Sequence, residues 1–337
     1  MLTPSPSPDP KYDKDWCFPD NEDGILSAIH KGATHLWANT ILFASHPLQT
    51  SSYLDEYQDQ VRVVGQPPLL VEKFDDKEFT NNLLRLRGSF TMPRAWTLHQ
   101  ADDLKSFLAH NNLPYPIVGK PIRGRGSHGV KVCHSSEEIY QHVQQLFEES
   151  PSIMLEEYLS GEEATITVMP PSAEKPDYWA MPIVVRFSHH CGIAPYSGVV
   201  AVTANSKTLS PEEAEKDVRY GEAVRECEAV ARLLHGTGPI RRDIRRFNHD
   251  SKSKFALFDI NMKPVSNHLH RITDPLPETD TFQFQNMTGP GRPGRENQAS
   301  LTALSASALG WAYPTLLHYI LNSASRLREL RTVKPRI

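Results

Sequence analysis

The stretch VGKPIRGRGSHGV, residues 118–130, decides how the rest of the chain is interpreted. An apolar segment ends at Lys120, and three glycines follow it among arginine, serine and histidine. Backbone N–H groups of such a segment can surround anionic oxygens while the lysine ammonium faces them. Taken alone, the segment fits a phosphate-binding loop and a solvated basic loop equally well. It matches neither GxxxxGK[ST] nor a GxGxxG that opens a helix, which disfavours a P-loop or a Rossmann site.

A second stretch, MLEEYLSGEEATITV at residues 154–168, has glutamate pairs on both sides of a glycine turn. Glu156 and Glu157 end one apolar strand, and Glu162 and Glu163 precede the next. Carboxylates at such a hinge can accept hydrogen bonds from an adenine amino group or from ribose hydroxyls. Taken alone, the stretch favours solvated surface glutamates, which are common at strand ends.

Acidic side chains also mark a pair of expected strands, GPIRRDIRRF at 238–247 and KFALFDINMKP at 254–264. Side chains alternate between the two faces of a strand, so Arg241 and Asp243 share one face, as do Asp259 and Asn261. Carboxylate and amide oxygens are the hard donors that Mg²⁺ prefers. For this pair alone, an arginine–aspartate ladder on a solvated surface is the alternative. The apolar residues before Asp259 and the nearby Pro264 count against it.

Composition indicates an ordinary globular protein. The 337 residues suffice for two or three domains, and a net charge of −4 shows no bias towards nucleic acid or membrane. We therefore expect small-molecule partners and a cytoplasmic location. No apolar run approaches the about 20 residues of a membrane span, and the N-terminus lacks a signal-peptide pattern. The four cysteines form no CxxC pair, which argues against zinc and against a disulfide framework.

Hydrophobic periodicity predicts alternating strands and helices. In the first part we expect a helix at 24–33, a buried strand at 34–44 and a helix at 76–87. A helix that starts with Ser-x-x-Glu is expected over 135–150. Later we expect a strand at 197–205 and a long helix at 211–234. A C-terminal helix is expected at 300–332, interrupted at Pro314.

In order and spacing, the three quoted motifs resemble the ATP-grasp superfamily, and within it the branch similar to D-alanine:D-alanine ligases. The resemblance spans Tyr115 to about Ser266. It implies a protein of the α/β and α+β classes with the ATP-grasp fold, in which a short N-terminal α/β domain precedes central and C-terminal α+β domains that clasp ATP. We expect a disordered segment at 1–23, the N-terminal domain at 24–88, the central domain with its glycine-rich lid at 89–160, and the C-terminal domain with the magnesium site at 161–337.

The resemblance implies binding roles for three groups of positions. The lid over the triphosphate would be formed by Gly124, Gly126, Ser127, His128 and Gly129. Adenine and ribose would be held by Glu156, Glu157, Leu159 and Glu163. The metal, Mg²⁺ with Mn²⁺ as an alternative, would be bound by Asp243, Asp259 and Asn261.

The same resemblance implies that catalysis depends on Lys120, Ser127 and Arg241. Lys120 would contact an ATP phosphate, and Arg241 would neutralise charge as the acyl group is transferred. Such ligases often have a second ATP lysine near the start of the central domain, but neither Lys77 nor Arg85 matches that place.

The chain departs from the family on the substrate side. Asp259 stands where glutamate is usual, and Pro264 is followed by Val265 where glycine is common. The acceptor pocket is therefore not tied to D-alanine, although the Val265 N–H remains available as an oxyanion donor. Our candidates for the substrate pocket are Tyr196, Val265, His268, His270 and Arg271.

Together, the motifs and the resemblance predict an ATP-dependent carboxylate–amine ligase that forms an amide or peptide bond through an acyl phosphate. The expected substrates are a small carboxylate and a small amine, both similar to amino acids. A homodimer is one expected assembly. Two alternatives stay open: an ATP-binding protein without ligase activity, and an ATP-grasp kinase that stops at a phosphorylated product.

Overall fold

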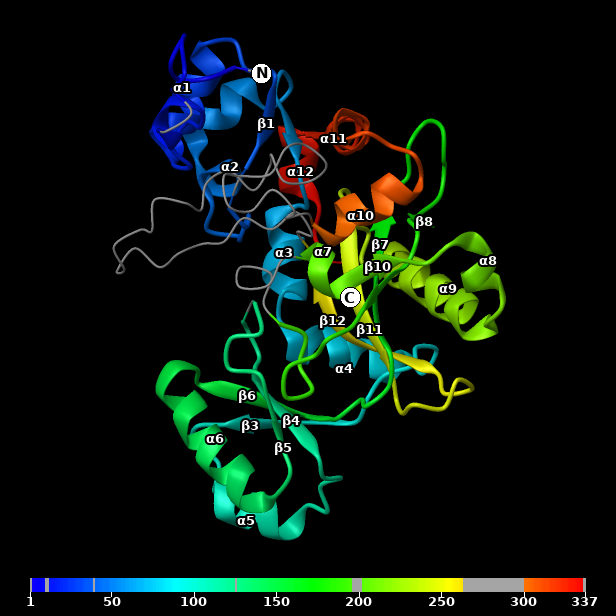
Figure 1. The fold of residues 1–337 in the computed structure, drawn as a ribbon. Coiled ribbons are helices and arrows are strands. Elements are labelled where there is room, and N and C mark those ends of the chain that lie inside the picture. Colours follow the sequence, from blue (N-terminus) through cyan, green and yellow to red (C-terminus); the bar gives the residue numbers. More distant parts are fainter. Residues whose placement is uncertain are drawn as a thin grey trace.

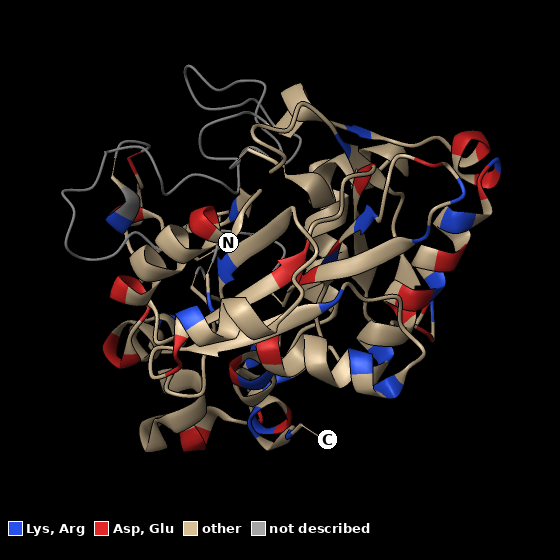
Figure 2. Cartoon of the chain, turned by 90° about the horizontal axis from the view of Figure 1, so that it is seen from below, with Lys and Arg blue, Asp and Glu red and all other residues tan. Residues whose placement is uncertain are grey.

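Three β-sheets organise the computed structural model, which describes residues 2–9, 12–38, 40–124, 126–195, 202–262 and 300–335. Figure 1 shows the three sheets in separate parts of the molecule, each with its own helices. Figure 2 shows basic and acidic residues of the described elements interspersed on the side drawn there. No helix in the described ranges is both long and apolar enough to cross a bilayer.

The first sheet joins the two ends of the chain. β1 (His35–Trp37) pairs in parallel with β2 (Arg62–Val64), and β13 (Ser325–Arg326) pairs antiparallel with β2. Around it lie η1 (Asp13–Asp15), α1 (Glu22–His30), α2 (Pro47–Thr50), η2 (Ser52–Tyr57), α3 (Pro68–Phe74) and α12 (Leu327–Thr332). The strand expected at 34–44 is shorter than predicted, because its later apolar residues enter the core without a strand partner: Leu42 is buried but irregular.

The second sheet is antiparallel, with strand order β3-β6-β4-β5. Its strands are β3 (Ala95–His99), β4 (Ile117–Pro121), β5 (Lys131–Cys133) and β6 (Ser152–Glu157), and its helices are α5 (Leu104–His110) and α6 (Ser136–Glu149). The Ser-x-x-Glu start of α6 is confirmed, because Ser135 accepts a hydrogen bond from the Glu138 N–H and Glu138 accepts one from the His134 N–H.

The third sheet has six strands in the order β10-β9-β7-β11-β12, with β8 paired to β7. Its strands are β7 (Glu163–Met169), β8 (Trp179–Ala180), β9 (Val184–Arg186), β10 (Ser206–Thr208), β11 (Ile240–Arg246) and β12 (Phe255–Asn261). Its helices are α7 (Val202–Asn205), α8 (Pro211–Glu215), α9 (Val218–Leu233), α10 (Leu301–Ala308) and α11 (Tyr313–Asn322). Between the second and third sheets lies α4 (Lys77–Arg87), which packs against β12 (Figure 1).

Three expectations about secondary structure need correction. Residues 202–205 of the strand expected at 197–205 are helical, and residues 197–201 lie outside the described residues. The helix expected at 211–234 is divided, because Asp217 caps a new helix by accepting a hydrogen bond from the Arg219 N–H at 2.9 Å. The C-terminal helix is broken near Pro314, as predicted, but also at Gly310, whose φ of 73° ends α10, and again at β13.

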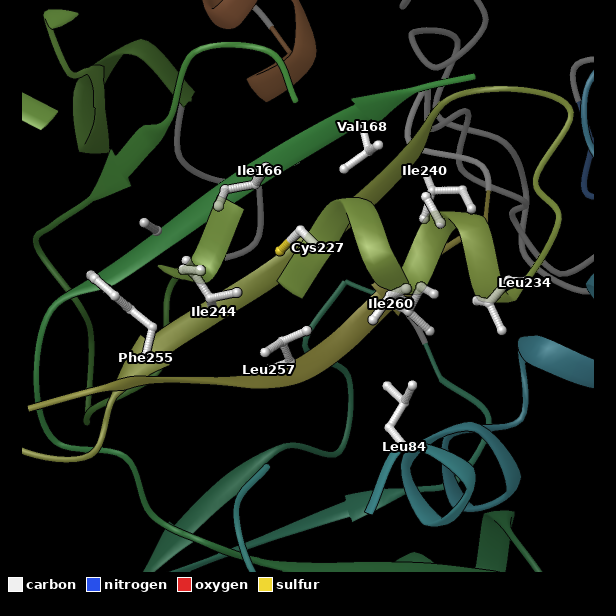
Figure 3. Packing of buried hydrophobic residues seen from close by; sticks show 14 of the residues in the cluster. Leu84, Ile166, Val168, Cys227, Leu234, Ile240, Ile244, Phe255, Leu257 and Ile260 are labelled. Carbon is white, nitrogen blue, oxygen red and sulfur yellow. The ribbon is translucent and has the colours of Figure 1, made fainter. Parts of the chain in front are cut away.

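The largest core lies on one face of the third sheet. Period-two alternation turns Ala164, Ile166, Val168 and Ile244 to the same side, where Ala223, Cys227 and Val230 of α9 cover them. Figure 3 shows Ile166 and Val168 of β7, Ile244 of β11 and Leu257 of β12 near Cys227 of α9. Arg242 is the exception on this face: it is fully buried, and none of its guanidinium nitrogens has a hydrogen-bond partner in the described part of the chain.

Candidate functional site

The opposite face of the third sheet carries the acidic residues singled out in the sequence. β11 and β12 pair Asp243 with Asp259 and Arg241 with Asn261, so these four side chains share one face. Thr165 of β7 lies opposite Asp243 on the other side of β11 and adds a hydroxyl to the same face. The predicted convergence of two carboxylates and one amide is therefore present. We call this surface the polar face, formed by Thr165, Arg241, Asp243, Asp259 and Asn261.

Asp243 is the most tightly held group of the polar face. Thr165 Oγ1 donates a hydrogen bond to Asp243 Oδ1 at 2.8 Å, and Asn261 Nδ2 donates to Oδ2 at 3.3 Å. Arg241 donates to both oxygens, at 3.2 and 3.1 Å. Burial raises the pKa of Asp243, but the charges of Arg241 and Arg186 and the donated hydrogen bonds outweigh it, so the pKa lies below its ordinary value.

Asp259 meets a lysine from a different part of the chain. Lys77 Nζ lies 3.5 Å from Asp259 Oδ1 and donates a hydrogen bond to the Gly124 carbonyl at 3.0 Å. Lys77 is the first residue of α4, whose N-terminus is fixed by the Asp76 side chain. Lys77 therefore connects the polar face to the base of the glycine-rich segment.

Lys120 and Glu156 form a buried ion pair across the second sheet. Lys120 Nζ donates to Glu156 Oε2 at 2.7 Å and to the carbonyl of Phe258, on β12, at 3.2 Å. The second carboxylate oxygen of Glu156 is buried without a hydrogen-bond partner in the described ranges, although Arg85 Nη2 lies 3.8 Å from it. Burial raises the pKa of Glu156 more than Lys120 and Arg85 lower it.

The glycine-rich segment has the backbone of a tight, irregular loop. Gly126, Ser127 and Gly129 have φ values of 62°, 60° and 68°, in the left-handed region that glycine adopts at low cost. Ser127 Oγ donates to the Ala194 carbonyl at 3.4 Å. His128 pairs with Glu149 at the end of α6, at 2.7 Å, and not with a group of the polar face.

The hinge residues separate into partly buried and fully buried positions. Glu157 binds Arg94, with 3.3 Å between Oε2 and Nε, whereas Leu159 is buried. Glu163 is buried as well, and its carboxylate lies 2.8 Å from His189 Nε2 and 3.6 Å from Arg186 Nη1. A ligand hydroxyl that donates a hydrogen bond to the Glu163 carboxylate would therefore do so beside His189 and Arg186. The predicted substrate residues Tyr196, Val265, His268, His270 and Arg271 lie outside the described residues.

Sequence reasoning missed how α4 lines the gap between the two sheets. Lys77, Asn81 and Arg85 recur every four residues and so share one helix face. They reach Asp259, the Met154 sulfur and Glu156 respectively. The signal in the sequence is the four-residue spacing of Lys77, Asn81 and Arg85 on a helix that Asp76 caps.

The donor chemistry of the polar face fits a divalent cation such as Mg²⁺. Asp259 Oδ1 is buried without a hydrogen-bond partner in the described part of the chain, and the Asn261 amide oxygen and Asp243 lie on the same face. These are hard oxygen donors. Within the described ranges, no three histidine, cysteine, aspartate or glutamate side chains cluster around a common point, so a metal here would rely on Asn261 and on oxygens from water or ligand.

Comparison with known proteins agrees with this geometry. The family profile described as the D-ala D-ala ligase C-terminus matches residues 89–266, more than half of the chain. A D-alanine–D-alanine ligase of Bacillus anthracis is 25% identical over 254 residues, which are 75% of this chain and 68% of that protein.

Solved structures show the same fold. The D-alanine–D-alanine ligase of Bacillus anthracis, solved as a complex with ATP, aligns with a TM-score of 0.57 at 19% identity, over 92% of this chain and 84% of that one. The D-alanine–D-alanine ligase of Coxiella burnetii aligns with a TM-score of 0.58 at 14% identity, over 89% of this chain and 69% of that one. The predicted ATP-grasp fold is confirmed. The chain belongs to the D-alanine–D-alanine ligase-like family, a family of ATP-dependent ligases.

Proposed function

We propose that the protein is an Mg²⁺- and ATP-dependent carboxylate–amine ligase that joins two amino-acid-like substrates. The observation that carries this proposal is that three cations from different segments of the chain lie at the polar face or beside it. Lys77 lies near Asp259, Arg241 pairs with Asp243, and Lys120 donates to the carbonyl of Phe258, the residue before Asp259. A site that alternates cations and carboxylates in this way suits a triphosphate bound together with a divalent cation.

In this proposal ATP lies between the second and third sheets. The unpartnered Glu156 oxygen would accept from the adenine amino group, and the backbone at Glu157 and Leu159 would hold the adenine edge. Glu163 would bind ribose, sharing its carboxylate with His189. The segment from Gly124 to Gly129 would close over the phosphates. The domains proposed at 24–88, 89–160 and 161–337 place this site where the central and C-terminal domains face each other.

Two ion pairs, one formed by Lys120 and one by Lys77, support a way in which the phosphates would be received. Lys120 is held by Glu156 and Lys77 lies beside Asp259, so each ammonium already has a negative partner. We expect the phosphate oxygens to take over both lysines, which leaves Asp259 free to bind the cation. A bound Mg²⁺ would neutralise charge on the phosphate oxygens and so favour transfer of the γ-phosphoryl group.

Chemistry would then proceed in two steps. The substrate carboxylate attacks the γ-phosphorus, forming an acyl phosphate and releasing ADP; the amine then attacks the acyl carbon, and phosphate leaves. The protein contributes mainly position and fixed charge. Arg241, anchored by Asp243, would face the oxygen that gains negative charge.

The test is ADP and phosphate release from MgATP with paired pools of amino acids and small amines, with mass spectrometry of the product. We expect release that needs two co-substrates and disappears in Lys120→Ala and Asp259→Ala. Lys131→Ala, an exposed lysine on the neighbouring strand β5, is the matched control and should retain activity. A phosphorylated product without an amide would indicate a kinase. Tight MgATP binding without any release would indicate an ATP-binding protein that is not a ligase.

A further inference from the structure

A small apolar pocket lies where the first and third sheets meet. Its volume is about 50 Å³, and its apolar walls come from both ends of the described chain. The large apolar side chains in its wall include Trp37, Ile41, Val64, Val71, Met262 and Ile320. Val64 and Ile320 belong to one hydrophobic cluster, and Val71 and Met262 belong to another, so the pocket lies at the junction of two cores.

The pocket offers little to a polar group. Gln66, in its wall, donates to the Gly238 carbonyl at 2.6 Å and accepts from the Thr237 N–H at 2.9 Å. Thr40, also in the wall, donates its hydroxyl to Asp20. Both side chains are therefore engaged with the protein itself. A charged or strongly polar group placed there would lose its hydration without finding a partner.

The position of the pocket relates it to the polar face. Trp37 and Val64 are the last residues of the parallel strands β1 and β2, and ligands of open α/β sheets bind outside the carboxyl ends of such strands. Met262 directly follows Asn261, and Pro239 precedes β11 by one residue. The pocket thus adjoins the end of the polar face formed by the Arg241–Asn261 pair.

We propose that this pocket receives the side chain of one of the two substrates, and that this substrate carries a short branched aliphatic side chain of the size found in valine. The inference rests on the proposed ligase function and names a substrate class for it. The size follows from the volume: an apolar cavity of about 150 Å³ holds the six carbon atoms of benzene, so a third of that volume suits about two carbon atoms, such as the two methyl groups of valine.

Selectivity should follow from apolar burial. Each methylene added to a substrate in a hydrophobic pocket is worth about tenfold or more in kcat/KM. Valine should therefore exceed glycine, serine, aspartate and lysine in the same role, until the side chain outgrows the pocket, as that of phenylalanine or tryptophan would.

The experiment compares kcat/KM for ADP release across single amino acids of both chiralities, each tested with a mixed partner pool. It uses the wild-type protein and Ile41→Trp, which places a larger side chain against the pocket. Leu321→Trp, a neighbour of the pocket residue Ile320 on an exposed position of α11, is the control. Thermal melting of each variant establishes that it is folded. Binding of valine is measured separately by calorimetry in the presence of a non-hydrolysable MgATP analogue, so that one readout is independent of turnover.

The proposal predicts an aliphatic preference of about tenfold or more over alanine in the wild type and in Leu321→Trp. In Ile41→Trp the preference should shift to alanine or glycine, valine binding should be lost, and the KM for ATP should stay unchanged. ADP release that favours charged side chains, or that Ile41→Trp leaves unaltered, would show that the pocket is only a packing gap while the ligase function stands. Absence of ADP release with every pool, together with no valine binding, would overturn both.

Discussion

The two faces of the third sheet are built from the same strands but are stabilised in different ways. One face buries Ala164, Ile166 and Ile244 in a single hydrophobic core that they share with residues of α9. The polar face balances the carboxylates of Asp243 and Asp259 with cations that come from β11 itself and from α4. The apolar face needs only hydrophobic side chains of suitable size, whereas the polar face needs particular side chains from distant segments. Substitutions on the two faces should therefore separate activity from stability.

The largest expected effect is a loss of activity and comes from Asp243→Asn. Asparagine keeps the size of the side chain and an acceptor for Thr165, so the fold should persist. Loss of the carboxylate removes a proposed metal ligand and the anchor of Arg241, and we expect turnover to fall by about 10³-fold. ADP release measures the activity, and circular dichroism the fold. Asp250→Asn on the exposed turn between β11 and β12 is the control. Turnover within a factor of two of wild type would contradict the role of Asp243.

The apolar face should give the opposite result with Ile166→Ala. Ile166 is fully buried, and removal of its side chain leaves a cavity between the sheet and α9 (Figure 3). We expect the free energy of unfolding to fall by about 3 kcal/mol, measured by urea denaturation. The dissociation constant of MgATP should not change. Val218→Ala, at the exposed start of α9, should cost much less. A large change in MgATP affinity would mean that the two faces are not separable.

Arg242 is a cation on the apolar face, and its replacement tests whether that face tolerates charge. Its guanidinium is fully buried without a hydrogen-bond partner in the described part of the chain. The carboxylates of Asp243, Asp259 and Glu156 act on it only at a distance. A buried charge without hydrogen bonds keeps much of its desolvation cost, so an apolar residue of similar size should be more stable in this place. We expect Arg242→Met to raise the free energy of unfolding by about 2 kcal/mol, and Arg242→Lys to give no such gain. A decrease in Arg242→Met would show that the guanidinium is compensated within the folded protein.

The smallest expected effect is a pH dependence of the polar face. The pKa of Asp243 is below its ordinary value in the folded protein. Its contribution to stability is therefore fully present above the unfolded pKa of about 3.9, and is lost as the pH falls through the lower folded value. Urea denaturation between pH 3 and pH 6 should show the stability difference between wild type and Asp243→Asn shrinking below about pH 4. A difference that stays constant with pH would contradict this electrostatic balance.

Much of the fold could be predicted because local signals agreed with it. The Ser-x-x-Glu start of α6 and the alternation in β11 and β12 are read directly from neighbouring residues. Predictions failed where a continuous apolar run does not distinguish between structures. The run at 34–44 forms only a short strand, and Val202–Asn205 is helical where a strand was expected.

The candidate site was predictable to the extent that its residues share one strand pair. The register of β11 and β12 brings Asp243, Asp259 and Asn261 together, as alternation implies. The approach of Lys77 to Asp259 depends on how α4 packs between two sheets, which no local pattern encodes. The same holds for the pairing of Glu163 with His189, and for the pocket at the junction of two cores.

The most direct test of the polar face is the dissociation constant of ATP measured by calorimetry with and without Mg²⁺, in the wild type and in Asp259→Asn. The account predicts that Mg²⁺ tightens ATP binding by about tenfold or more in the wild type and that Asp259→Asn loses this gain. Without Mg²⁺, the variant should bind ATP at least as well as wild type, because one negative charge near the phosphates has been removed. ATP binding that is independent of Mg²⁺, or a gain from Mg²⁺ that persists in Asp259→Asn, would contradict the account.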